Sequence, residues 1–361
     1  MGKKIKLFIP GPTEVSEKTF QAFSRPMIGH RSKAFQELYH SIQPQLQQLL
    51  CTKNGIFLST SSAWGVMEAA VRNLTRTRVL NCMNGAFADK WHDVSVAVGK
   101  PADKLQVDWG KPITGELIRK QLGDGHFDVL TVIHNETSTG TMSPIEEIAA
   151  VMKEFPDTLF VVDAVSSLSG VKIDCDKLGI DVLITGSQKA LALPPGLALF
   201  TVSPRALERA KSVKDRGYYF DFLEFLKNHE KNMTPSTPSI GHVHALQSKL
   251  QDILAEGLDA RFARHRAMQK LVHEWVKKNG FELFPEAKHA SVTLSCIRNS
   301  RNIDVPKLIE MLKTKYACVI DGGYGKLKGQ TFRISHMGDE TPETVGLLLK
   351  WLDDCLKEIG A

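Results

Sequence analysis

The amino-acid sequence predicts an α/β protein that has a large domain with a mostly parallel sheet and a smaller α+β C-terminal domain. Helical and strand patterns alternate from about residue 33 to about residue 213, which is typical of a parallel sheet with helices on both faces. The chain has 361 residues, of which 42% are hydrophobic, and this length exceeds what one core usually holds. We therefore expect an N-terminal arm over residues 1–16, a large domain over 17–255 and a small domain over 256–361.

The expected elements follow from the spacing of apolar residues, because a period near 3.6 predicts a helix and a short apolar run predicts a buried strand. In the large domain, helices are expected at 35–50 (with Pro44 as a candidate kink), 64–74, 86–98, 115–122, 145–155 and 204–212. Strands are expected at 56–58, 78–82, 105–107, 129–133, 159–163, 182–185 and 198–202. A long charged helical stretch runs from Ile240 to about Lys278, with an expected break near Gly257. The small domain is expected to contain strands at 291–296, 317–320 and 331–335 and helices at 305–315 and 344–359.

The charge and cysteine patterns argue against nucleic-acid binding, a membrane span and a metal centre. The net charge of +6 is mild, and the basic residues are scattered among acids instead of forming a basic stripe. The six cysteines form no CxxC pair, so neither a zinc site nor a disulfide framework is expected. The apolar stretch 7–9 is too short for a signal peptide, and no apolar run approaches the length of a bilayer span. The expected location is the cytoplasm.

Lys189 is the residue that most strongly indicates a function. It lies behind small polar residues and before the Pro-Gly loop at 194–196, where a lysine is poorly solvated. Enclosure near other positive charge lowers the pKa of an ammonium group, so the free amine that attacks an aldehyde becomes available near neutral pH. The usual aldehyde is pyridoxal phosphate. A structural lysine is the alternative from this residue alone.

Two further segments suit the same cofactor. Asp163 ends an apolar run, at the strand edge where ligands of open α/β sheets bind, and an anion there would keep a pyridinium nitrogen protonated. In the segment 57–71, an apolar strand gives way to Thr60, Ser61 and Ser62 and then to a helical run. The amides of a first helical turn and nearby hydroxyls favour a phosphate. A plain helix cap is the alternative.

The phosphate-binding segment, the acid and the lysine, in this order, resemble the corresponding parts of class V aminotransferases, which are fold-type I pyridoxal phosphate enzymes. The similarity is greatest to the alanine–glyoxylate and serine–pyruvate (or serine–glyoxylate) branch. It covers nearly the whole chain, through segments 8–13, 27–31, 84–87, 134–140, 162–163 and 329–334. The resemblance implies the fold-type I transferase fold, pyridoxal 5'-phosphate as the cofactor, and a Schiff base between the cofactor and Lys189.

The resemblance also implies which residues contact the cofactor. Phe87 is expected to stack on the cofactor ring, where related enzymes often have tryptophan, and a core phenylalanine is the alternative. Thr137 is expected to donate to the phenolic oxygen, and Gln188 to the phosphate. The residues expected at the phosphate-binding helix are Ser62, Ala63 and Trp64, the last of which is larger than its counterpart in many relatives.

Arg333 is the candidate for binding the substrate. A guanidinium between apolar strand residues usually pairs with an anion, because its planar fork matches a carboxylate. The resemblance implies that Arg333 binds the substrate's α-carboxylate, and a structural salt bridge is the alternative. Gly29 is also expected to face the substrate. His134 and Glu136 look like an acid–base pair, but we expect them to shape their turn because Lys189 suffices as the base.

Thr234 and Thr237 fall where the family brings residues from the neighbouring subunit to the phosphate. The resemblance therefore implies a homodimer with a shared active site. Related enzymes often have tyrosine at the first of these positions, so the role of Thr234 is less well supported. A proline-threonine turn is the alternative for both residues.

The expected activity is transfer of an amino group from a small amino acid, alanine or serine, to glyoxylate or pyruvate by a ping-pong mechanism. One arginine placed for a carboxylate favours monocarboxylic substrates. A pyridoxal phosphate lyase of the desulfurase or kynureninase-like type is the first alternative, although a desulfurase needs a mobile cysteine and no cysteine lies in a Gly/Ser-rich loop. A binding module without catalysis is the second.

Overall fold

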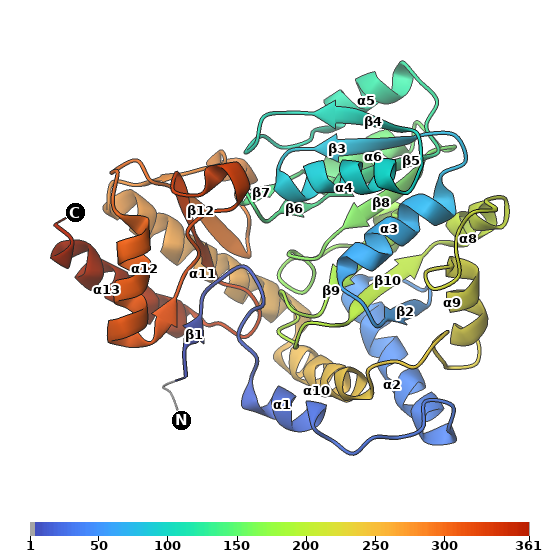
Figure 1. Cartoon of the computed structure of the whole chain (residues 1–361), viewed down its shortest axis with the longest axis horizontal. Helices are drawn as coiled ribbons and strands as arrows, with labels where there is room; N and C mark the ends of the chain where they lie inside the picture. The colour runs from blue at the N-terminus through green and yellow to red at the C-terminus, as the bar shows by residue number, and fades with distance from the viewer. Residues whose placement is uncertain (1–3, 361) are drawn as a thin grey trace.

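The larger part of the computed structural model, which describes residues 4–360, is built around a seven-stranded sheet (Figure 1). Its strands are β2 (Ile56–Ser59), β3 (Val79–Met83), β4 (Ala102–Gln106), β5 (Val129–Ile133), β8 (Leu159–Asp163), β9 (Val182–Gly186) and β10 (Ala198–Val202). They lie in the order β2-β10-β9-β8-β5-β3-β4. All neighbours from β9 to β4 are parallel, whereas β10 runs antiparallel to β2 and β9. The prediction of a mostly parallel α/β sheet is confirmed.

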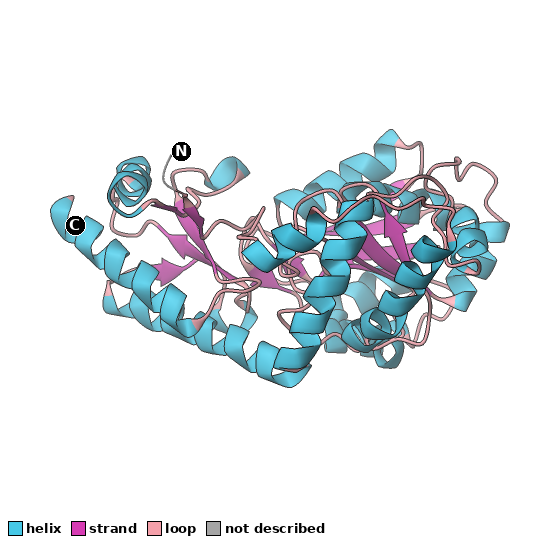
Figure 2. Ribbon diagram, turned by 90° about the horizontal axis from the view of Figure 1, so that it is seen from below, coloured by secondary structure: helices cyan, strands magenta, loops and turns pink. Residues whose placement is uncertain are grey.

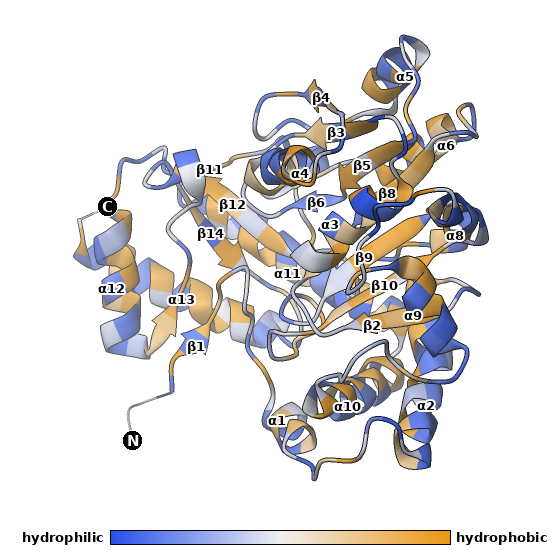
Figure 3. Cartoon of the chain, turned by 45° about the vertical axis from the view of Figure 1, so that its right-hand side comes forward, coloured by the Kyte–Doolittle hydropathy of each residue, from blue (hydrophilic) through white to orange (hydrophobic). Residues whose placement is uncertain are grey.

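Helices cover both faces of this sheet. They are α2 (Lys33–Leu50), α3 (Ala63–Leu74), α4 (Ala86–Ala97), α5 (Gly115–Gly123), α6 (Ile145–Met152), α7 (Cys175–Leu178), α8 (Pro204–Lys211), α9 (Phe222–His229) and α10 (Ile240–Glu256). One hydrophobic core contains residues of α2, α5, α6 and α10, and a second contains residues of α3, α4, α8 and α9. Phe160 and Val162 of β8 belong to the first core and Leu159 and Val161 to the second, because successive strand residues point to opposite faces. Central strands such as β5 and β9 are therefore largely apolar (Figure 3), whereas the edge strand β4 carries Asp103 and Lys104.

The C-terminal part has its own antiparallel sheet and its own core. Strands β11 (Glu282–Leu283), β12 (Leu294–Arg298) and β14 (Thr331–Ser335) pair in the order β11-β12-β14. Helices α11 (Leu258–Lys278), α12 (Val305–Tyr316) and α13 (Pro342–Glu358) pack around them, and Figure 2 shows the two sheets with their surrounding helices. The N-terminal strand β1 (Lys6–Leu7) pairs in parallel with β13 (Cys318–Val319), and Phe8 enters the third core. The start of the chain thus packs against the C-terminal part.

Several expected elements agree with the structure residue for residue, and others were shifted or missed. Strands 129–133, 159–163, 198–202 and 331–335 have the predicted limits. Gly257 separates α10 from α11 at a φ of 86°, whereas Pro44 lies inside an unbroken α2. The strand expected at 291–296 is β12 at Leu294–Arg298, because the Ser291 hydroxyl accepts from the amides of Thr293 and Leu294 and holds a turn there.

The sequence patterns gave no expectation of α1 (Glu17–Phe23), α9 or the hairpin of β6 (Asn135–Glu136) and β7 (Thr141–Met142). These elements are short, so their periodicity is weak. The boundary expected near residue 255 falls in the last turn of α10, and the domain limits themselves stay a prediction. Within residues 4–360, no helix has the length and apolar content to cross a membrane, and no cluster of three potential metal ligands occurs.

Candidate active site

A pocket of about 240 Å³ lies at the carboxyl ends of β5, β8 and β9. The eight candidate residues that line it are Ser62, Ala63, Trp64, Phe87, Thr137, Asp163, Gln188 and Lys189. A more open groove of about 440 Å³ lies beside residues 122–127 and 154–158, but its lining contains no lysine. We place the site in the smaller pocket because parallel sheets bind ligands at the carboxyl edge of their strands.

Lys189 follows β9 by three residues and is held against the N-terminal segment. Its Nζ donates to the carbonyl oxygen of Pro10 at 2.6 Å. Gly11 lines the same pocket at a φ of 138°, and a Cβ on Gly11 would lie 2.8 Å from Nζ. Burial, followed by the charge of Arg333, lowers the pKa of Lys189 to about 8. A substantial fraction of this amine is therefore unprotonated near neutral pH.

Asp163 is the last residue of β8 and lies in the wall of the same pocket. Its Oδ1 accepts a hydrogen bond from the amide of Val165 at 2.6 Å. Burial raises the pKa of Asp163 to about 7, and the nearby Glu136 carboxylate adds to the rise while Lys189 opposes it. A cation placed against Asp163 would favour its ionised form, so this carboxyl is suited to a protonated ring nitrogen.

The pocket has an anion-binding end where α3 begins. Ser62 is the N-cap of α3, and its side chain makes no capping hydrogen bond. Gln188 reaches the same region, and its Oε1 is buried without a hydrogen-bond partner among residues 4–360. Backbone amides and a free hydroxyl at a helix N-terminus suit a phosphate group, to which the Gln188 amide can donate through its Nε2 but not through Oε1.

Thr60 and Ser61 do not line this pocket, contrary to the expectation that their hydroxyls would add donors to it. The Thr60 hydroxyl accepts from the amide of Ser239, and the Ser61 hydroxyl pairs with that of Ser59 at 2.9 Å. The Ser61 hydroxyl therefore stabilises the strand-to-helix turn, whereas that of Thr60 joins this turn to the start of α10.

Phe87 enters the pocket from the first turn of α4, which Glu136 holds in place. Glu136 accepts from the amide of Ala88 at 3.0 Å and from the amide and hydroxyl of Ser138. A Cβ on Gly85 would lie 2.3 Å from the Glu136 side chain, so the close approach needs glycine. Burial raises the pKa of Glu136, against these hydrogen bonds. Glu136 does not line the pocket, so its contacts serve the local turn.

His134 is likewise buried outside the pocket lining. Its Nδ1 lies 3.0 Å from the hydroxyl of Ser167. Burial lowers the pKa of His134 to about 4, so the ring is neutral over the physiological range. The side chain joins the end of β5 to the loop that follows β8.

Thr137 and Arg333 connect the pocket to the C-terminal sheet. The Thr137 hydroxyl donates to the hydroxyl of Ser166 at 2.9 Å, and its carbonyl oxygen accepts from Arg333 Nη1 at 2.8 Å. Arg333 lies on β14 with 4% of its side chain exposed, and its Nε and Nη2 both contact Asp321 Oδ1, at 2.9 and 2.8 Å. This ion pair is the structural salt bridge given as the alternative for Arg333, although its partner Asp321 was not predicted from the sequence.

Four predicted site residues are absent from the pocket lining of their own chain: Arg333, which contacts the lining residue Thr137, and three others, Thr234, Thr237 and Gly29. Thr234 is buried beside the end of β2, and its hydroxyl donates to the carbonyl oxygen of Ser236 at 2.8 Å. The Thr237 hydroxyl is 3.5 Å from His30 Nε2, and Gly29 is exposed in the preceding loop. One chain alone therefore brings none of the three to the site.

Sequence reasoning missed six residues of the lining, namely Gly11, Met67, Ile133, Asn135, Val165 and Ser166. Asn135 donates to the hydroxyl of Ser166 at 2.9 Å. Both residues follow the carboxyl end of a predicted strand, where ligands of parallel sheets bind, so this position could have identified them as lining residues. Gly11 had no such signal, because its contact with Lys189 joins distant parts of the chain.

The chain belongs to the aminotransferase class-V family, whose model matches residues 13–342. The fold and the pocket thus belong to a pyridoxal phosphate-dependent aminotransferase. The cofactor fits the pocket in three respects: an amine of lowered pKa, a carboxyl group across from it, and a helix N-terminus with unpaired polar atoms beside it.

Individual relatives agree with this assignment. An uncharacterized aminotransferase from Methanocaldococcus jannaschii is 38% identical over 360 residues, which cover 98% of this chain and 93% of that protein. An L-aspartate–glyoxylate aminotransferase from Paracoccus denitrificans is 32% identical, over 93% of this chain and 87% of its own. The crystal structure of an alanine–glyoxylate aminotransferase from Nostoc sp. matches with a TM-score of 0.93 at 28% identity, over 99% of this chain and 96% of that one.

Proposed function

We propose that this aminotransferase moves the amino group of a small amino acid, alanine or serine, to glyoxylate or pyruvate. The observation that carries the proposal is the pocket that Lys189 and Asp163 line together, with Arg333 in contact with the lining residue Thr137. The charge of Arg333, after burial, contributes to the lowered pKa of Lys189, which supports a carboxylate-binding role for Arg333 near the amine. The alanine–glyoxylate enzyme from Nostoc sp. supports this choice of substrates.

Each residue has a distinct role in the proposed reaction. When bound, pyridoxal phosphate supplies an aldehyde that takes up the amino group and a ring that accepts electrons. Lys189 attaches the cofactor and, once released, moves the proton of the substrate's α-carbon as a free amine. Asp163 keeps a proton on the ring nitrogen. Phe87 lies against the ring, and the start of α3 with Gln188 binds the phosphate.

The size of the substrate is limited by large side chains at the pocket. Trp64 and Phe87 both line a volume of only about 240 Å³, which the cofactor must share with the substrate. Lys189 is the only basic residue in the lining formed by residues 4–360, and Arg333, which contacts the lining residue Thr137, is the one arginine proposed to bind a carboxylate. This supports a monocarboxylic donor over aspartate, the donor named for the Paracoccus enzyme.

We further propose that the enzyme works as a homodimer in the cytoplasm. Thr234 and Thr237 lie outside the pocket of their own chain, which is compatible with a role at the pocket of a neighbouring subunit. All six cysteines are free, and five of them are buried, as is usual for proteins in a reducing compartment. Sedimentation analysis together with complementation between an inactive Lys189 variant and an inactive Thr237 variant would test the shared site.

A single-donor experiment separates the proposed activity from a lyase. With alanine or serine and no acceptor, an aminotransferase should release about one 2-oxo acid per subunit and then stop, whereas a lyase should continue. None of the cysteines lines the pocket, which disfavours desulfurase chemistry. Lys189→Ala is the control and should release none. Continued product formation without acceptor would refute the proposal.

A further inference from the structure

The proposed carboxylate-binding arginine is already paired with an acid from its own chain. Asp321 follows β13, and its Oδ1 contacts Arg333 through Nε at 2.9 Å and Nη2 at 2.8 Å. The same oxygen accepts from the amide of Gly323 at 2.9 Å. Asp321 thus turns its Oδ1 toward Arg333 and the Gly323 turn, while Oδ2 has no hydrogen-bond donor among residues 4–360 and 28% of the side chain is exposed.

The contacts of Arg333 leave part of its guanidinium available. A guanidinium has five N–H groups, and the two contacts with Asp321 and one with the Thr137 carbonyl oxygen use three of them. The ring of Tyr324 lies 5.4 Å from the Arg333 Cζ and is stacked on Phe87 at 5.0 Å. An incoming carboxylate therefore meets an arginine that is fixed in position, partly covered, and neutralised by Asp321.

We propose that Asp321 is a positioning and specificity-determining residue, which aims Arg333 at the substrate while its negative charge weakens the binding of carboxylates and excludes dicarboxylates. The inference rests on the proposed role of Arg333 in binding the substrate. A small monocarboxylate can take the two remaining N–H groups. A dicarboxylate brings a second negative charge close to the unpaired Oδ2 of Asp321, and like charges in a partly buried site repel.

The test compares two variants of Asp321. Asp321→Asn keeps an oxygen that can accept from Arg333 and Gly323 but removes the charge, whereas Asp321→Ala removes both. Binding is measured by calorimetry on the cofactor-loaded protein in its pyridoxal form, with pyruvate as the monocarboxylate and 2-oxoglutarate as the dicarboxylate. Neither probe carries an amino group, so neither can start amino transfer in this form.

We expect Asp321→Asn to bind pyruvate about tenfold more tightly, because the repulsion between the Asp321 charge and the single carboxylate of the probe is removed. It should bind 2-oxoglutarate about a hundredfold more tightly, because two such repulsions between partly exposed carboxylates are removed. Asp321→Ala should bind pyruvate less tightly than Asp321→Asn, because Arg333 loses the oxygen that holds it. Asp103→Asn is the matched control, since Asp103 pairs with Arg78 at 3.2 Å outside the site. Asp103→Asn should leave both dissociation constants unchanged.

Unchanged or weaker binding of both probes by Asp321→Asn would overturn the inference, and so would an equal gain for the two probes. Equal binding by the Asn and Ala variants would refute the positioning role. If Asp321→Asn does not fold, Asp321→Ser provides the same uncharged comparison. A protein that binds pyruvate as described but performs no amino transfer would refute the proposed function and not this inference.

Discussion

Lys189 and Pro10 are joined by a hydrogen bond of 2.6 Å from the lysine Nζ to the proline carbonyl oxygen. This contact ties the N-terminal segment to the residue that attaches the cofactor. Strand β1, three residues before Pro10, is paired with the C-terminal part of the chain. The lysine is therefore positioned by the large sheet on one side and by the N-terminal segment on the other.

Substitution of Gly11 should disturb this arrangement. A Cβ on Gly11 would lie 2.7–2.8 Å from the side chain of Lys189, and the φ of 138° strains any other residue. We expect Gly11→Ala to lower kcat/KM, with a rise of about 2 kcal/mol or more in the corresponding activation free energy, which is the usual energetic scale for overpacking with backbone strain. Gly99→Ala is the control, because Gly99 has a φ of 76° but no atom within 4 Å of an added Cβ. Equal losses in both variants would show that the lysine contact is irrelevant.

The lowered pKa of Lys189 predicts how the cofactor loads. Only the unprotonated amine attacks an aldehyde, so the rate at which the apoenzyme takes up pyridoxal phosphate should rise as pH increases through about 8. An exposed lysine, whose pKa is about 10.5, would show this rise only near that pH. The measurement is stopped-flow absorbance between pH 6 and pH 10, with Lys189→Ala as the blank. A rise confined to the highest pH would contradict the lowered pKa.

Removal of Arg333 should weaken the binding of carboxylate substrates. Arg333→Ala is expected to raise KM for every 2-oxo acid and to lower kcat/KM. The corresponding activation free energy should rise by about 2 kcal/mol, the scale of a charge-assisted hydrogen bond. Arg298→Ala serves as the control, because Arg298 lies on the neighbouring strand β12 and its side chain is exposed. Steady-state kinetics with glyoxylate and pyruvate would check both variants. If Arg333→Ala kept normal kinetics, the carboxylate would have to bind elsewhere.

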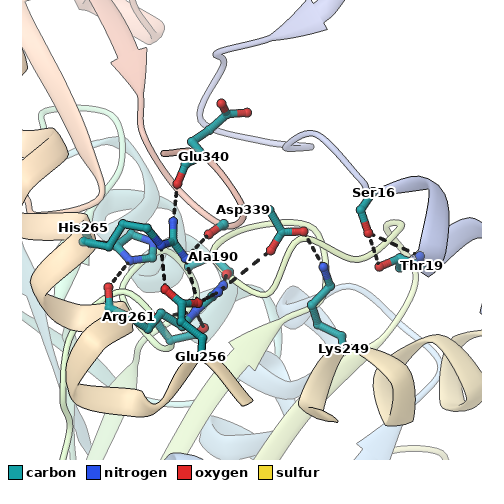
Figure 4. Close-up of polar contacts among 12 residues, drawn as sticks. Ser16, Thr19, Ala190, Lys249, Glu256, Arg261, His265, Asp339 and Glu340 are labelled. Atoms are coloured by element: carbon teal, nitrogen blue, oxygen red, sulfur yellow. Dashed lines mark hydrogen bonds and ion pairs between the residues drawn. The ribbon is translucent and has the colours of Figure 1, made fainter. Parts of the chain in front are cut away.

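A buried charge network behind Lys189 should be sensitive to the loss of Arg261 (Figure 4). Arg261 is 2% exposed; it pairs with Glu256 at 3.0 Å and donates to the carbonyl oxygen of Ala190 at 3.0 Å and to Ser169. We expect Arg261→Ala to lower the free energy of unfolding by about 2–4 kcal/mol, because it leaves the buried oxygens of Ala190 and Ser169 without a donor, whereas Glu256 keeps its contacts with Arg264. Urea unfolding of the holoenzyme would measure the loss.

The exposed pair of Arg119 and Glu154 provides a comparison for this network. Arg119 contacts Glu154 at 2.6 Å, but about half of each side chain is exposed. Solvent screens such a pair, so Arg119→Ala should leave the free energy of unfolding nearly unchanged. If Arg119→Ala and Arg261→Ala lowered the free energy of unfolding by similar amounts, the burial of Arg261 would not explain its contribution to stability.

Two buried histidines should make the protein less stable in acid. Burial lowers the pKa of both His265 and His336 to about 3, from the usual histidine value of 6.5. Between these values the unfolded chain binds protons that the folded chain does not, so stability falls as pH falls below 6.5. We expect each histidine to cost about 2 kcal/mol between pH 6.5 and pH 5.

Urea unfolding at pH 7 and pH 5 checks this prediction. In His265→Gln, the free energy of unfolding should fall less between pH 7 and pH 5, because one of the two histidines is absent. Asp163 acts in the opposite direction. Burial raises the pKa of Asp163 from the usual 3.8 to about 7, so the folded chain holds a proton there that the unfolded chain has lost. This contribution to the free energy of unfolding is lost as pH rises from 3.8 toward 7. Asp163 is present in both the variant and the unaltered protein, so its contribution cancels when their pH dependences are compared. An unchanged pH difference in His265→Gln would refute the role of the histidine.

The local elements and the chemical groups of the site were predictable from the sequence. Strands β5 and β8 are buried on both faces, so unbroken apolar runs mark them, and Asp163 follows as the polar residue at the strand end. Lys189 and the start of α3 stand beside similar strand ends. These features depend on neighbours within a few residues, which is the range over which periodicity and strand edges act.

Contacts between distant segments were decided only by tertiary packing. The sequence has no local signal that places Pro10 on Lys189, 179 residues away, or that pairs Asp321 with Arg333 across a glycine-rich loop. Thr60 and Ser61 carried a hydroxyl pattern that suits a phosphate, yet the turn directs them elsewhere. The sequence by itself determined most of the strands, the longer helices and the reactive groups, whereas the packing of the two sheets and the N-terminal segment decided which of those groups meet. The physical reason is that hydrophobic burial is non-directional, so an apolar pattern specifies which face is covered but not which polar atoms come together there.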